Sequence, residues 1–154
     1  MALKRTNSWV ETIEALRNRE CDMAMQIAET DSRLEYLIFT QPYVFFPQVV
    51  VTRTDAPFIS GTSGILGEKI AAVEGYAIVE ILSKKYPDLD VVEVKNHEEG
   101  VRKVAEGEVF GFIDFLPSAS RANSDFGAGT LKISGSLDEK ISLGAGVRSN
   151  APEL

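Results

Sequence analysis

Short apolar segments alternate with helical patterns from Lys69 to the end of the chain. Residues 69–73, 91–94 and 109–113 are compact apolar runs of the length that is typical of strands. The segments that follow Gly75 and Asn96 instead carry their apolar residues on one side of a helix. Strands that alternate with helices build βαβ units, so this part of the chain is predicted to be an α/β fold with a largely parallel sheet.

The ends of these elements carry recognisable signals. Pro87 ends the first helix because proline cannot continue one, and Asn96 is expected to cap the second. Pro117 is expected to be the first residue of a short helix. Two more strands are predicted, at residues 130–133 and 141–147.

The N-terminal segment reads as a helix followed by strands. Ser8 and Glu11 form a capping box, and Trp9, Ile13 and Leu16 then fall on one helical stripe that is expected to be core. Alternation over residues 21–28 predicts a strand, Thr30-Asp31-Ser32 is a turn cluster, and residues 49–52 form a second strand.

Composition excludes several classes of protein. The net charge of −7 over 154 residues argues against a nucleic-acid or anionic-membrane surface, since both need a concentrated positive field. No run approaches the roughly 18 apolar residues of a membrane helix, and the start has no apolar segment of a secretion signal. A single cysteine, Cys21, excludes an intrachain disulfide and is expected to be a small buried hydrophobe.

The chain lacks the patterns of an enzyme or a metalloprotein. His97 is the only histidine, and its place at a predicted helix start indicates an exposed side chain. One histidine and one cysteine cannot close a zinc site, and Ser118 and Ser120 lack a nucleophile context. The glycines near residues 61–67 and 127–129 fit neither a phosphate loop nor a dinucleotide fingerprint. No catalysis, cofactor or metal is therefore expected.

A series of short motifs follows a characteristic order along nearly the whole chain. The motifs are Ser8-Trp9, Asp22, Thr30-Asp31-Ser32-Arg33, Phe39-Thr40-Gln41-Pro42-Tyr43 and the segments 49–53, 66–76, 104–107 and 143–154. Together they resemble the bacterial extracellular solute-binding proteins of family 3, the amino-acid type with the type 2 periplasmic binding fold. The resemblance is strongest to the variety that serves as sensor domains of signalling proteins.

The resemblance implies a two-lobed fold in which an arginine binds the carboxylate of a small ligand. That arginine is Arg33, whose planar fork suits two carboxylate oxygens; from spacing alone it would instead be a solvated surface residue. Thr30 is a possible hydroxyl donor or a turn residue. Tyr43 and Phe39 are expected to offer an aromatic wall, with core packing as the alternative for Phe39.

The second lobe is expected to supply the remaining contacts. Gly75 and Tyr76 open a helix whose backbone amides attract anions, or form an ordinary tight turn. Glu74 or Asp114 is expected to receive an ammonium group, unless each is a plain surface acid. In amino-acid binders of the family the matching aspartate falls, by count, at Phe115; Asp114 is one residue earlier, and neighbours in a strand face opposite ways.

The resemblance also implies an organisation and a location. Residues 1–52 are expected to form a partial lobe one that lacks the family's first elements, 53–142 lobe two and 143–154 a return crossover. The domain is expected to be periplasmic or extracytoplasmic, with hinge closure reporting an amino acid or carboxylate to a membrane kinase or cyclase module. The alternatives are a transport receptor for a permease, and a ligand-free interaction module of the same fold. Uncovered apolar surface in lobe one would favour self-association.

Overall fold

A computed structural model describes residues 2–125 and 129–150, with only the backbone described for residues 122–125. The chain divides into two compact units. Unit 1 comprises Met1–Phe45 and Ile141–Leu154, and unit 2 comprises Phe46–Lys140. The lobe boundaries expected from the sequence lie a few residues further along the chain in both places.

Unit 1 is built from two short helices and three strand segments. Its elements are α1 (Trp9–Arg17), β1 (Met23–Ile27), α2 (Asp31–Leu34), β2 (Leu37–Phe39) and the end of β8 (Leu131–Arg148). Both β1 and β2 pair antiparallel with β8. The core is Leu16, Ile27 and Leu37, with Trp9, Ile13, Cys21 and other partly buried residues packed against it. The helical stripe predicted as core is thus confirmed.

The start of α1 shows how the local sequence fixes a helix end. The Ser8 hydroxyl accepts a hydrogen bond from the Glu11 amide at 3.1 Å, as a capping box requires. The Glu11 carboxylate, however, accepts from the Asn7 amide at 2.7 Å, one residue earlier than a standard box would have it. The first turn is satisfied either way, because both contacts occupy backbone donors that the helix leaves open.

Unit 2 contains the sheet that the sequence predicted. Its elements are β3 (Val44–Arg53), β4 (Ile59–Ser60), a 3-10 turn η1 (Thr62–Ile65), β5 (Lys69–Val73), α3 (Ala77–Lys85), β6 (Asp90–Val94), α4 (His97–Ala105), β7 (Gly111–Phe115), α5 (Leu116–Asp125) and the start of β8. The strand order is β8-β3-β7-β5-β6. Strands β6, β5 and β7 are parallel, and β3 runs antiparallel to β7.

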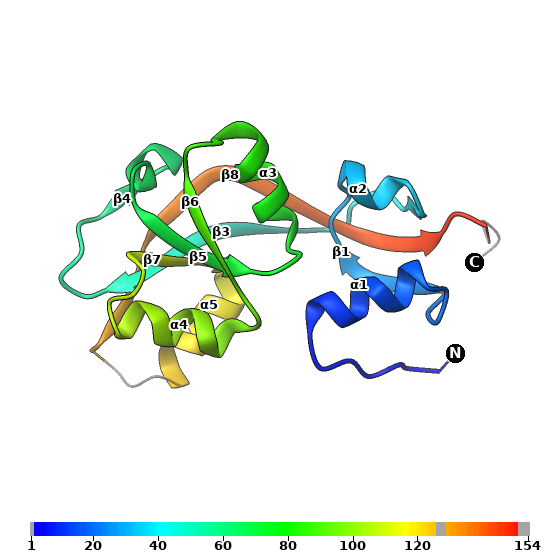
Figure 1. Ribbon diagram of the computed structural model, residues 1–154, viewed down its shortest axis with the longest axis horizontal. Helices are drawn as coiled ribbons and strands as arrows, with labels where there is room; N and C mark the ends of the chain where they lie inside the picture. The colour runs from blue at the N-terminus through cyan, green and yellow to red at the C-terminus, as the bar shows by residue number, and fades with distance from the viewer. Residues whose placement is uncertain (1, 126–128, 151–154) are drawn as a thin grey trace. The chain divides into compact units, whose positions relative to one another are not determined.

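The helices of unit 2 cover both faces of this sheet. Helices α4 and α5 pack on β7 and on each other, and α3 packs on β5 from the other side (Figure 1). Gly100 allows α4 to lie close to the sheet, since a Cβ there would be 2.4 Å from the Phe112 ring. This close approach holds the middle of α4 against the beginning of β7.

Several elements differ from the sequence prediction. Residues 131–133 and 141–147 belong to one strand, β8, rather than two, and residue 130 lies in the turn before it. Strand β7 begins at Gly111, two residues later than predicted, and α5 runs for 10 residues with Pro117 as its second residue rather than its first. Pro117 is still tolerated because the amide it lacks has no partner in the first turn of a helix.

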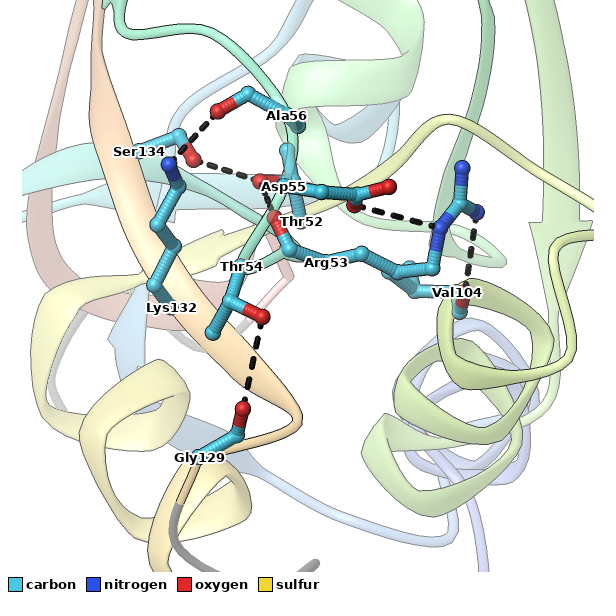
Figure 2. Close-up of polar contacts among 9 residues, drawn as sticks. All are labelled: Thr52, Arg53, Thr54, Asp55, Ala56, Val104, Gly129, Lys132 and Ser134. Carbon is cyan, nitrogen blue, oxygen red and sulfur yellow. Dashed lines mark hydrogen bonds and ion pairs between the residues drawn. The ribbon is translucent and has the colours of Figure 1, made fainter.

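Contacts distant in sequence explain why β8 is continuous. Ser134 and Lys132 on β8 contact Thr52 and the Ala56 carbonyl, while the Thr54 hydroxyl donates to the Gly129 carbonyl at 3.3 Å (Figure 2). These bonds hold a polar part of β8 in an extended conformation. Its composition alone would be typical of a turn.

Glu139 anchors the middle of β8 in the same way. Its carboxylate accepts hydrogen bonds from Thr62, from Lys85 at 3.0 Å and from Tyr86 at 3.2 Å. Burial alone would raise the pKa of Glu139, but these donors outweigh burial and lower the pKa.

A glycine-to-alanine change tests the packing of β4 against β8. A Cβ at Gly135 would lie 1.9 Å from the backbone oxygen of Ile59. Because that oxygen belongs to a paired strand, Gly135→Ala must separate β4 from β8, and we expect the free energy of unfolding to fall by about 1–3 kcal/mol in urea titrations. The adjacent, exposed Ser136→Ala is the matched control, and equal stability of the two variants would contradict this packing.

Candidate functional site

The carboxyl ends of three parallel strands meet at one edge of the unit 2 sheet. Strand β5 ends at Val73 and leads into Glu74, Gly75 and Tyr76. Strand β6 ends at Val94, just before His97 opens α4, and β7 ends with Asp114 and Phe115. Open α/β sheets bind their ligands at this kind of edge, because the loops and helix N-termini there are free to carry functional groups.

Asp114 and His97 form the central contact of this edge. The Asp114 side chain is fully buried, and its Oδ2 lies 2.6 Å from Nδ1 of His97. Its Oδ1 accepts a hydrogen bond from the Phe115 amide at 2.8 Å. The hydrogen bond and charge of Asp114 raise the pKa of His97 above its ordinary value, although burial acts in the opposite direction. A buried carboxylate is thereby satisfied by a partner that is easily protonated.

Tyr76 extends the contact toward the start of α3. Its hydroxyl lies 3.4 Å from Nε2 of His97, and its ring lies 6.1 Å from the ring centroids of both His97 and Phe115. Burial and then the charge of Asp114 raise the pKa of Tyr76 to about 12. The phenol therefore keeps its proton at physiological pH.

The turn between β5 and α3 brings backbone to the same edge. Gly75 has a φ of 74°, a left-handed conformation that favours glycine. The preceding amide, of Glu74, donates to the Val94 carbonyl at 2.9 Å and ties this turn to the end of β6. Tyr76 is the N-cap of α3, as predicted, and its side chain makes no cap hydrogen bond, so the positive end of the helix faces the edge.

One sequence expectation for this edge is incomplete and another is wrong. His97, expected to be exposed, has a side chain that is 39 % exposed and that also contacts Asp114. The reading of Asp114 as a surface acid fails because the residue is completely buried. The sequence carries no direct signal for the pair, which joins a helix start to a strand end.

Gln48 is a polar residue at this edge that sequence reasoning missed. It lies on β3 opposite Phe115, and it is 1 % exposed. Neither its Oε1 nor its Nε2 has a hydrogen-bond partner among the described residues. Buried amides are normally satisfied, so this side chain is a candidate for contact with water or with a ligand. The sequence signal that could have identified Gln48 is its place as a polar residue within the apolar run of β3.

The remaining predicted site residues lie in unit 1. Arg33 lies in α2 and is 4 % exposed, so its alternative reading as a solvated surface residue is wrong. Its Nη1 donates to the Ala28 carbonyl at 2.6 Å, and the guanidinium carbon lies 5.5 Å from the centre of the Trp9 ring. These contacts hold the cation in a defined place next to the end of β1.

Thr30 and Tyr43 flank Arg33 in the sequence and are both available to solvent to some degree. Thr30 is the N-cap of α2, and its hydroxyl is 3.0 Å from that of Ser32. The Tyr43 hydroxyl accepts from the Gln26 amide at 3.1 Å, and the residue is 47 % exposed. Both are therefore placed by local hydrogen bonds.

Within residues 2–125 and 129–150, no group of three or more histidine, cysteine, aspartate or glutamate side chains could hold a metal ion. In the same part of the chain, no helix has both the length and the apolar character to cross a membrane.

The single histidine makes the Asp114 contact directly measurable. We expect the NMR titration of His97 to give a pKa above the ordinary value of about 6.5, and Asp114→Asn to lower it. Since the folded pKa exceeds the unfolded one, the stabilising contribution of His97 is fully present below about pH 6.5 and is lost as pH rises through the folded pKa. Glu98→Gln, an exposed change on the same helix, is the control. An unchanged His97 titration in Asp114→Asn would contradict the pairing.

Comparison with known proteins identifies the family. The sequence profile of the bacterial extracellular solute-binding proteins, family 3, matches residues 3–154. The virulence sensor protein BvgS of Bordetella pertussis is 33 % identical over 128 residues, which is 83 % of this chain and 10 % of that protein. The probable amino-acid-binding protein YxeM of Bacillus subtilis is 30 % identical over 91 residues, 58 % of this chain and 34 % of the relative. The chain thus spans about a tenth of the length of the BvgS relatives.

Solved structures agree with this assignment. The periplasmic VFT2 domain of Bordetella pertussis BvgS, as a double mutant, has a TM-score of 0.80 at 29 % identity, covering 96 % of this chain and 64 % of that one. An arginine-bound ArgBP from T. maritima shares the fold, with a TM-score of 0.81 at 20 % identity over 97 % of this chain and 70 % of that one. These relatives are sensor and solute-binding proteins rather than enzymes. The mixed α/β fold and the resemblance drawn from the sequence motifs, including the sensor variety, are therefore confirmed. The chain belongs to the bacterial extracellular solute-binding proteins, family 3.

Proposed function

We propose that this chain is a periplasmic sensor domain that binds a small amino acid or carboxylate and passes the signal to an attached membrane signalling module. The observation that carries the proposal is the cluster of Tyr76, His97 and Asp114 at the carboxyl edge of the unit 2 sheet. Such an edge is where α/β sheets bind ligands. The family is one of solute-binding proteins, and a sensor protein is among its relatives.

Unit 1 is proposed to contribute Arg33 as the group that binds the ligand's carboxylate. Its guanidinium is already positioned by the Ala28 carbonyl and the Trp9 ring, so little side-chain freedom remains to be lost on binding. A guanidinium has five donors, and two of them can meet a carboxylate side by side. Thr30 and Tyr43 are proposed as accessory contacts of the same unit.

Hinge closure is the proposed way in which binding becomes a signal. The chain passes between the units twice, within β3 at Phe45–Phe46 and within β8 at Lys140–Ile141. A ligand that contacts both units favours a closed arrangement only by the additional contacts it makes there. The strand segments at these two crossings are the proposed hinge.

Binding and its dependence on Arg33 can be tested by calorimetry of the intact protein against amino acids and small carboxylates. We expect heat from at least one of these compounds, and an affinity at least about tenfold lower in Arg33→Lys, which keeps the charge but loses the planar fork. Arg17→Lys, an exposed change in the same unit, is the matched control. Equal affinity of both variants and the unchanged protein would show that Arg33 does not contact the ligand.

Self-association is the second candidate function, and exposed apolar side chains in unit 1 favour it. Met25, Leu34 and Ile38 are 58 %, 48 % and 40 % exposed. Surfaces of this kind commonly serve as contacts with another chain.

Light scattering at high protein concentration measures that association. We expect the chain to form dimers or larger species, and the double change Met25→Ser, Ile38→Ser to shift it toward the monomer. Leu3→Ser, at a position that is 91 % exposed, should leave the mass unchanged. A sharp monomer without any substitution would refute self-association and leave ligand sensing untouched.

A further inference from the structure

Asp114 is buried away from a positively charged ligand group. Its Oδ1 accepts from the Phe115 amide at 2.8 Å, its Oδ2 lies 2.6 Å from Nδ1 of His97, and the side chain is 0 % exposed. An ammonium group would have to displace the imidazole and leave it without its partner. Displacing one partner of a buried charged pair is costly, because the remaining group is left unsatisfied.

The ring nitrogen of His97 that does not contact Asp114 favours an anion rather than a cation. With Nδ1–H directed to Asp114, Nε2 is the nitrogen that remains, and it carries a proton when the ring is charged. The Tyr76 hydroxyl lies 3.4 Å from this nitrogen and stays protonated. The side chain of His97 is 39 % exposed, so a small molecule can reach the ring.

The surroundings of the imidazole offer few competing charges. The titratable groups that face it from other elements are Asp114 on β7 and Tyr76 at the start of α3. Phe112 and Phe115 add aromatic rings, with the Phe112 ring 6.3 Å from that of His97. On its own helix the neighbouring acids are Glu98, which is exposed, and Glu99, whose carboxylate accepts from the Lys95 amide.

We propose that His97 is the specificity-determining residue of this edge, and that it selects carboxylates without an α-ammonium group over the matching amino acids. The imidazole is bound to the fully buried carboxylate of Asp114, and its Nε2 offers a donor that suits an anion when the ring is charged. Glu74 remains for an ammonium, but it is exposed, and exposed ion pairs contribute little. This inference rests on the proposed function, since it requires that the ligand contacts the unit 2 edge.

Matched pairs of compounds test the selection by calorimetry on the intact protein. The pairs are propionate with alanine and 3-phenylpropionate with phenylalanine, which differ only in the amino group. We expect the carboxylate of at least one pair to bind about tenfold or more tightly than its amino acid, a difference of the size that one charged hydrogen bond gives. We also expect carboxylate affinity to be higher at pH 6 than at pH 8.5, because the imidazole is protonated at the lower pH.

The variant His97→Gln removes the titratable imidazole and its charge, while its amide can still donate to Asp114. We expect it to lose the preference for the carboxylate and the pH dependence together, while Glu98→Gln retains both. Tighter binding of the amino acids by the unchanged protein, or a preference that persists in His97→Gln, would overturn this inference alone. The absence of heat from both members of each pair, and from every compound of the wider set of amino acids and carboxylates, would overturn the proposed function, and the pH comparison needs no variant that might misfold.

Discussion

The hydrogen bond between Asp114 and His97 organises the carboxyl edge of unit 2. Burying a carboxylate is costly unless a partner compensates its charge, and here the partner arrives from the first residue of α4. The bond requires α4 to lie close to β7, and the absence of a side chain at Gly100 allows that approach. The Asp114–His97 contact therefore links the packing of α4 on β7 to the protonation of the His97 imidazole.

The same physical rule explains the buried cation of unit 1. The contacts of Arg33 include a backbone carbonyl and an aromatic face. A guanidinium carries five N–H donors and can serve more than one acceptor at once. The proposed carboxylate ligand would add to these contacts, just as a ligand anion would add to those of His97.

Local sequence signals predicted many of the helices and strands. Contacts between residues distant in sequence determined the features that these signals did not predict. Asn96 caps α4, as expected, by accepting from the Glu99 amide at 2.9 Å, and β5, β6 and β7 are parallel as their alternation with helices implies. The continuity of β8 was missed because its polar middle is held by Thr62 and by donors from α3 and the residue after it. The contact of His97 was missed for a similar reason: its partner is 17 residues away, on another element.

The NMR signal of the His97 ring during titration with 3-phenylpropionate is the most direct test of the role of the Asp114–His97 contact. We expect the ring signals to shift as the site fills and the imidazole pKa to rise further, because a bound anion favours the charged ring. Saturable binding by calorimetry, with the His97 signals and titration unchanged, would place the ligand elsewhere and contradict the central role of the Asp114–His97 contact.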